Sequence, residues 1–147
     1  VLALRSQNGA ESATIPRVSM EELLGKADFL SLHCPLTETN TGLVDESFLA
    51  KMKPSAFLIN TARGGLIQTE ALLDALDQGL IRGAAIDVLT KEPATPDEPL
   101  LAMPRPNLIV TPHNAWGASE SRAQLIYQLC ENIEAWQAGT PIRRVNP

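Results

Sequence analysis

AFLINTARGG (residues 56–65) is the most informative segment of this chain. Its apolar half suits a buried strand, and the run then changes to small and polar residues around Arg63. Open α/β sheets bind their ligands at the carboxyl ends of the strands. Gly64 and Gly65 let the backbone approach a flat ligand closely, and a guanidinium can hold a small carboxylate through two parallel hydrogen bonds. Arg63 is therefore a candidate binding residue; the alternative is a surface arginine in a strand-to-helix turn.

Strand and helix patterns alternate on both sides of this stretch. We expect strands at residues 1–6, 28–34, 56–62, 83–89 and 107–112. We expect helices at residues 20–27, 46–52, 69–78 and 119–137. Apolar strands that alternate with helices predict an α/β fold with a doubly wound parallel sheet, covered on both faces. The last helix is apolar on two sides, so we expect it to pack between this domain and a structure outside the chain.

The composition excludes several classes of function. A net charge of -5 over 147 residues argues against broad binding to nucleic acid or to an anionic membrane. There is no signal peptide and no apolar run of membrane-spanning length, so a cytoplasmic location is expected. Cys34 and Cys130 lie in unrelated contexts and are expected to be reduced core residues. His33 and Cys34 would point to opposite faces of a strand, so no metal site is expected.

Polar residues follow three consecutive strands of the predicted sheet. Arg63 follows the third, Asp87 and Glu92 follow the fourth, and His113 follows the fifth. Because neighbouring parallel strands end side by side, these residues can meet above one edge. A carboxylate beside a histidine fixes the orientation of the imidazole and favours its protonated form, which can give a proton to a carbonyl oxygen. Together with an arginine that holds a carboxylate, such a pair suits a 2-keto or 2-hydroxy acid.

Each of these residues also has a simpler interpretation. His113 can be a structural or solvent-exposed histidine, and His33 is expected to be structural. Glu92, before a proline, can be an ordinary loop residue, and Asp87 can cap a turn. The positions alone do not name a reaction.

Three longer stretches carry a resemblance to a known family. They are LHCPLTETNTGL (32–43), the run from LINTARGG to TKEP (58–93) and NLIVTPHNAWGASESR (107–122). They closely resemble the D-isomer-specific 2-hydroxyacid dehydrogenases, and the likeness extends from about Ser19 to Pro147. The resemblance implies a nicotinamide-dependent oxidoreductase of which this chain is the cofactor-binding part. The PHNAW and IDVLTKEP segments look most like the glycerate dehydrogenase/hydroxypyruvate reductase branch, so hydroxypyruvate, glyoxylate or D-glycerate is the favoured substrate.

The resemblance also implies roles for individual residues. Arg63 would hold the substrate carboxylate and polarise its carbonyl, His113 would be the general acid/base, and Glu92 would orient His113. Asp87 would lie against the nicotinamide carboxamide, and Trp116 would contact the substrate. The implied cofactor contacts also include His113, the backbone of Thr61, Ala62 and Arg63, and Cys34 and Pro35 on the adenosine side.

The chain departs from the family pattern at its start. No G-x-G-x-x-G is present, and in the family that loop follows a first strand that would precede Val1. The sheet is therefore expected to be incomplete, with buried edges left unpaired, and the isolated chain is not expected to be a stable monomer.

A second departure concerns the choice of cofactor. The acidic residue expected after the second family strand is absent; Arg5 and Ser6 stand near that place, and the nearest acid is Glu11. A cation there favours a 2′-phosphate, so the cofactor is NAD or NADP, with Arg5 indicating NADP. The alternative is that Arg5 is merely exposed and the alignment is shifted by one residue.

The family's substrate-binding domain is absent from these 147 residues. We expect residues 1–117 to be a partial dinucleotide-binding domain, and residues 118–147 a helix and tail that pack on the missing domain. The chain alone is expected to be inactive, and the complete protein is expected to be a homodimer acting on a small acid. Two alternatives stay open: a nucleotide-sensing protein-interaction module of the same fold, and a truncated paralogue without activity.

Overall fold

The computed structural model describes residues 1–5 and 14–145 of the chain. The chain divides into two compact units, Val1–Pro112 and His113–Pro147. The predicted domain boundary, after residue 117, falls shortly beyond this division.

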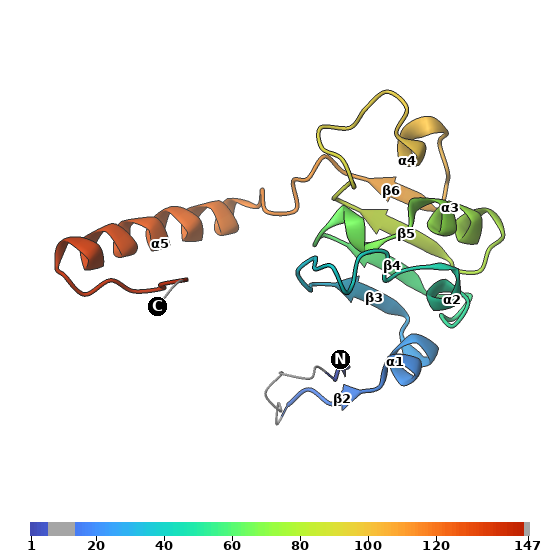
Figure 1. The fold of residues 1–147 in the computed structure, drawn as a ribbon, viewed down its shortest axis with the longest axis horizontal. Helices are drawn as coiled ribbons and strands as arrows, with labels where there is room; N and C mark the ends of the chain where they lie inside the picture. The colour runs from blue at the N-terminus through green and yellow to red at the C-terminus, as the bar shows by residue number, and fades with distance from the viewer. Residues whose placement is uncertain (6–13, 146–147) are drawn as a thin grey trace. The chain divides into compact units, whose positions relative to one another are not determined.

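Four parallel strands form the main sheet of the first unit, in the spatial order β3-β4-β5-β6 (Figure 1). They are β3 (Phe29–Leu32), β4 (Phe57–Asn60), β5 (Gly83–Ile86) and β6 (Leu108–Val110). Each strand pairs with the next one along the chain, and all pairs are parallel. The predicted Rossmann-type α/β class is therefore confirmed, although every strand is shorter than its apolar pattern.

Two short strands form a separate parallel sheet, β1 (Ala3–Leu4) and β2 (Arg17–Val18). The strand predicted over residues 1–6 is therefore much shorter, and β2 was not predicted; Ser6 and Glu11 lie outside the described residues. An apolar hollow of about 420 Å³ is lined by residues 1–4 and residues 29–34, together with part of α1 (Met20–Lys26). β1 and β3 belong to different sheets and do not pair with each other.

The remaining helices of the first unit are α2 (Glu46–Leu49), α3 (Thr69–Asp77) and α4 (Pro99–Ala102), with a 3₁₀ turn η1 (Gly64–Leu66). Ser19 caps the start of α1, where its hydroxyl accepts from the Glu22 N–H. Gly79 ends α3 with φ +68, and the Gly79 and Leu80 N–H groups donate to the carbonyls of Leu76 and Ala75. The turns α4 and η1 were not predicted because they are too short to show helical periodicity.

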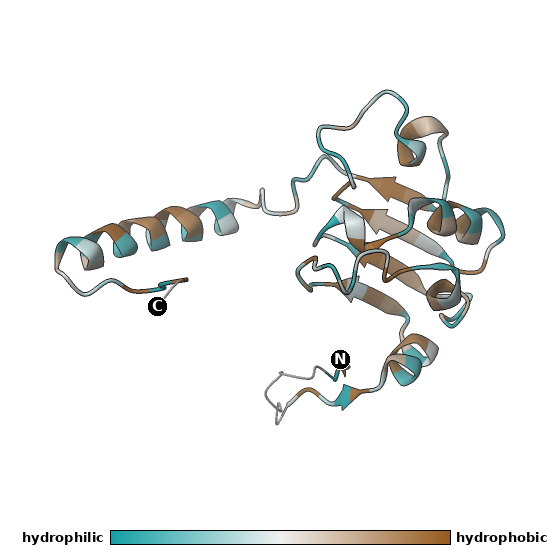
Figure 2. Cartoon of the chain, in the orientation of Figure 1, coloured by the Kyte–Doolittle hydropathy of each residue, from teal (hydrophilic) through white to brown (hydrophobic). Residues whose placement is uncertain are grey.

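One face of the main sheet carries the core. Along β3, Leu30 and Leu32 are buried while the alternate residue Phe29 is 69% exposed. On β6 Ile109 is 65% exposed, and Figure 2 shows that the strands are hydrophobic and most connecting loops hydrophilic. We expected both faces of the sheet to be covered, but among the described residues none buries the side chains of Phe29 and Ile109. A parallel sheet with apolar side chains on both faces needs a layer of helices on each face. The described residues of this unit do not form the second of these layers.

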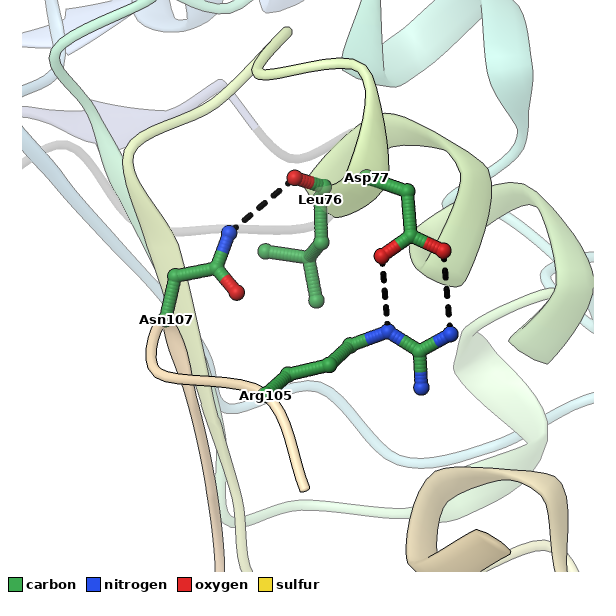
Figure 3. Close-up of polar contacts among 4 residues, drawn as sticks. All are labelled: Leu76, Asp77, Arg105 and Asn107. Atoms are coloured by element: carbon green, nitrogen blue, oxygen red, sulfur yellow. Dashed lines mark hydrogen bonds and ion pairs between the residues drawn. The ribbon is translucent and has the colours of Figure 1, made fainter. Parts of the chain in front are cut away.

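A cluster of polar contacts joins the end of α3 to the segment before β6 (Figure 3). The Arg105 Nε and Nη2 groups donate to the two carboxylate oxygens of Asp77, at 2.8 and 3.0 Å. The Asn107 Nδ2 group donates to the Leu76 carbonyl at 3.0 Å. The hydrogen bonds from Arg105, and then its charge, hold the pKa of Asp77 below its ordinary value of 3.8. The pair fixes α3 against the amino end of β6.

We expect the Asp77→Asn variant to be less stable than the wild type at pH 7, and this difference in stability to be smaller at about pH 3. A carboxyl whose pKa is lowered in the folded state stabilises above its unfolded pKa of about 3.9, and this contribution is lost as the pH falls through the folded pKa. Urea unfolding at both pH values measures the difference. Asp74→Asn, an exposed change on the same helix, is the control. A stability difference for Asp77→Asn that is the same at both pH values would contradict the argument.

The second unit consists of α5 (Ser119–Gln137) and a tail. Gly139 follows the helix with a left-handed φ of +74, and Arg143 of the tail donates to Asn132 and Glu131 on the helix at 3.0 and 2.7 Å. None of the α5 residues is buried, so Cys130, which was predicted in the core, is instead exposed. No helix among the described residues has the length and hydrophobicity to cross a bilayer.

Candidate functional site

The loop that carries Arg63 is shaped by the last residue of β4. Asn60 is fully buried; its Oδ1 accepts from the Ala62 N–H at 3.0 Å and its Nδ2 donates to the Arg63 carbonyl at 2.9 Å. The Arg63 side chain is exposed, and its Nη1 donates to the Ala62 carbonyl at 2.6 Å. Thr61 is also exposed. The loop therefore presents a guanidinium at the carboxyl edge of the sheet, as predicted.

The loops that follow β4 and β5 are in direct contact. A Cβ atom on Gly64 would lie 2.0 Å from the carbonyl carbon of Leu89, so only glycine allows the two backbones to come this close. In the second loop, the Leu89 N–H donates to Oε1 of Glu92 at 2.8 Å. The structure thus places the exposed Glu92 in a loop that touches the Arg63 loop.

Gly64→Ala is expected to destabilise the protein by more than about 3 kcal/mol, because a backbone-to-backbone contact cannot relax around an added methyl group. Gly25→Ala is the matched control: a Cβ there meets nothing within 4 Å, and alanine within α1 should stabilise by about 0.5–1 kcal/mol. Urea unfolding curves of the two variants give both values. Similar small effects from both changes would mean that the loops are not packed as described.

Asp87 is a buried carboxylate directly after β5. It is 4% exposed, and its N–H donates to the Asn60 carbonyl at 2.9 Å. The Thr111 hydroxyl, directly after β6, donates to Oδ1 of Asp87 at 2.5 Å. Sequence reasoning found Asp87 but missed Asn60 and Thr111; the available signal was that each is a polar residue at the end of an apolar strand.

His113 and Trp116 belong to the second unit. His113 follows Thr111 by two residues and has a left-handed backbone with φ +52, which is uncommon for a residue other than glycine. Its carbonyl accepts from Nε1 of Trp116 at 2.9 Å, and the indole is 60% exposed. The two predicted residues of this unit are therefore joined in one turn.

The residues predicted on the adenosine side lie after β3 and β1. Cys34 is half-buried and Pro35 is exposed, and Nδ2 of Asn40 donates to the Pro35 carbonyl at 2.8 Å. Arg5 is exposed and its N–H donates to the Val18 carbonyl at 2.9 Å, which extends the pairing of β1 with β2 by one residue.

Cys34 and Cys130 are both free thiols. His33 shares a 2.8 Å hydrogen bond with the Ser31 hydroxyl. Within residues 1–5 and 14–145, no group of three or more His, Cys, Asp or Glu residues is placed to hold a metal.

A parallel α/β sheet with functional loops at its carboxyl edge defines the dinucleotide-binding class of fold. Residues 2–115 match the family model described as the NAD binding domain of D-isomer specific 2-hydroxyacid dehydrogenases. The chain therefore belongs to the D-isomer specific 2-hydroxyacid dehydrogenase family.

Individual relatives agree with this assignment. The chain is 47% identical to a glycerate dehydrogenase of Methylorubrum extorquens over 124 residues, which cover 84% of this chain and 40% of the relative. It is 40% identical to a hydroxypyruvate reductase of Blautia hydrogenotrophica over 129 residues, which cover 88% and 39%. The solved structure of an acyclic imino acid reductase in complex with NADPH and D-Arg superimposes with a TM-score of 0.85 at 37% identity, covering 99% of this chain and 46% of that one. The chain thus spans less than half the length of these relatives.

Proposed function

We propose that this chain, completed by a substrate-binding domain, is an NAD(P)-dependent dehydrogenase that interconverts a small 2-keto acid and its D-2-hydroxy acid. Hydroxypyruvate, glyoxylate and D-glycerate are the favoured substrates, because the similar proteins include a glycerate dehydrogenase and a hydroxypyruvate reductase. The observation that supports the proposal is the contact between the loops after β4 and β5, because Arg63 and Glu92 belong to these two loops.

The residues at this edge fit a nicotinamide cofactor. Asp87 is a buried carboxylate at a strand end, which suits the N–H₂ donors of a carboxamide, and the backbone of Thr61, Ala62 and Arg63 lies in the exposed loop beside it. Cys34 and Pro35 would line the adenosine side. When bound, the cofactor supplies or accepts the hydride.

The chain's own residues orient the substrate and move the proton. Arg63 holds the carboxylate with two parallel hydrogen bonds and stabilises charge on the adjacent carbonyl oxygen. The His113 imidazole gives its proton to that oxygen in reduction and takes it back in oxidation. Glu92 orients the imidazole, and Trp116 contacts the substrate. The binding of the substrate carboxylate by Arg63 thus holds the reacting carbon of the substrate in position.

The proposal is tested with the full-length gene product and with residues 1–147, each assayed on hydroxypyruvate and glyoxylate with NADH and NADPH. We expect turnover from the first and negligible turnover from the second, which lacks the substrate-binding domain. A full-length protein that binds NADPH without reducing either acid would instead support the nucleotide-sensing module. Efficient turnover by residues 1–147 would overturn the assignment of this chain as a cofactor domain alone.

Arg5→Ala is expected to raise KM for NADPH by about tenfold or more, while KM for NADH changes less than about twofold. An exposed cation directly after β1 stabilises a 2′-phosphate, and tenfold corresponds to about 1.4 kcal/mol. Steady-state kinetics with both cofactors measure the effect. Lys26→Ala, which removes an exposed cation paired with Glu22, is the control. A wild-type protein that strongly prefers NADH would show that Arg5 does not select the cofactor.

A further inference from the structure

Asn60 is the polar residue on which the candidate site is built. Its side chain is completely buried at the end of β4, where the neighbouring core residues are apolar. Its backbone carbonyl accepts from the Asp87 N–H, and its side-chain amide bonds to Ala62 and Arg63. One residue therefore links the strand that ends before Arg63 to the strand that ends before Asp87.

The geometry requires an amide at this position. The Ala62 N–H needs an acceptor and the Arg63 carbonyl needs a donor, and the two are satisfied by the oxygen and nitrogen of one side chain at 3.0 and 2.9 Å. Asparagine offers both groups on a short stem and is suited to bond to the backbone two residues ahead. These two hydrogen bonds fix the backbone at Ala62 and Arg63, and therefore the position from which the Arg63 side chain extends.

We propose that Asn60 is a positioning residue that sets Arg63 for binding the substrate carboxylate. This inference rests on the proposed function, because it assigns Asn60 an effect on 2-keto acid binding. Asn60 does not touch the substrate; it acts through the backbone of Arg63. Its loss therefore raises KM for the keto acid more than it lowers kcat.

Asn60→Asp gives a test that depends on pH. The ionised carboxylate still accepts from the Ala62 N–H, but it faces the Arg63 carbonyl oxygen without a donor. The protonated carboxyl group regains a donor and an acceptor, and burial favours this neutral form. We expect KM for hydroxypyruvate in the full-length variant to be raised about tenfold or more at pH 8, and to return to within about threefold of the wild type at pH 5.5.

Asn107→Asp is the matched control. Asn107 also donates from Nδ2 to a backbone carbonyl, that of Leu76, but it lies before β6, at the opposite edge of the sheet from Arg63. This variant loses the same kind of hydrogen bond, so its unfolding curve shows the cost to stability. Its KM for hydroxypyruvate should follow the wild-type pH profile.

Asn60→Ser provides a second measurement if the aspartate variant does not fold. A serine hydroxyl can make one of the two bonds but is too short to make both, so KM should be raised at every pH without recovery in acid. A wild-type KM in this variant overturns the inference, as does an Asn60→Asp variant with the wild-type pH profile. A wild-type protein that reduces no 2-keto acid would instead refute the proposed function, so the two failures are distinguishable.

Discussion

His113→Gln lowers kcat for hydroxypyruvate reduction by about 10²- to 10⁴-fold in the full-length protein, the range expected when a general acid is removed. Glutamine keeps a polar side chain of similar reach but cannot donate a proton as an acid near neutrality. The left-handed backbone of His113 and its bond from Trp116 hold the residue in a defined turn. A large loss in kcat with little change in cofactor affinity therefore follows if the imidazole carries the proton.

The second histidine of the chain is the control for this measurement. His33 is also exposed at the end of a strand, and its ring shares a hydrogen bond with Ser31. His33→Gln should leave kcat within about twofold of the wild type, because the ring has no role in proton transfer. Equal effects of the two substitutions on kcat would remove the argument for His113 as the acid.

Arg63→Met is expected to lower kcat/KM by about 10²- to 10⁴-fold. Two hydrogen bonds to a charged group contribute about 1.5–3 kcal/mol each, and every 1.4 kcal/mol corresponds to a factor of ten. Arg63→Lys keeps the charge but loses the planar pair of donors, so a smaller loss of about 10- to 100-fold is expected. Steady-state kinetics on hydroxypyruvate at fixed cofactor concentration give both values relative to the wild type.

Arg82→Met separates loss of this site from general loss of positive charge. Arg82 is exposed and lies immediately before β5, at the amino end of the strand and away from the Arg63 loop. Its removal should leave kcat/KM within about twofold of the wild type. If Arg63→Lys were fully active, the guanidinium would not be needed as a two-pronged donor, and a simple charge would be sufficient.

Local features of the chain were predictable because their causes are local. Apolar runs that alternate with helical patterns predicted the four strands of the main sheet. The bounds predicted for α5 are the ones that the structure has. The caps at Ser19 and Gly79 follow from side-chain and backbone preferences of single residues. The short elements β2 and α4 were missed because two to four residues carry no periodic signal.

Burial was the least predictable property. The strands are apolar on both faces, which predicted two covering layers, whereas Phe29 and Ile109 are exposed in the structure. An apolar helix pattern likewise placed Cys130 in a core, and it is exposed. Hydrophobicity shows that a surface needs a partner, but it does not show whether the partner lies within the same segment of chain.

Three things could be predicted from the amino-acid sequence: the class of fold, the family, and the strand ends that carry Arg63, Asp87, Glu92 and His113. These depend on residue type and spacing along the chain. The three-dimensional structure was needed to show that Gly64 lies against Leu89 and that Thr111 bonds to Asp87. Such contacts join backbone and side-chain atoms of different strands, and their partners are set by how the strands pair in space rather than by any local preference.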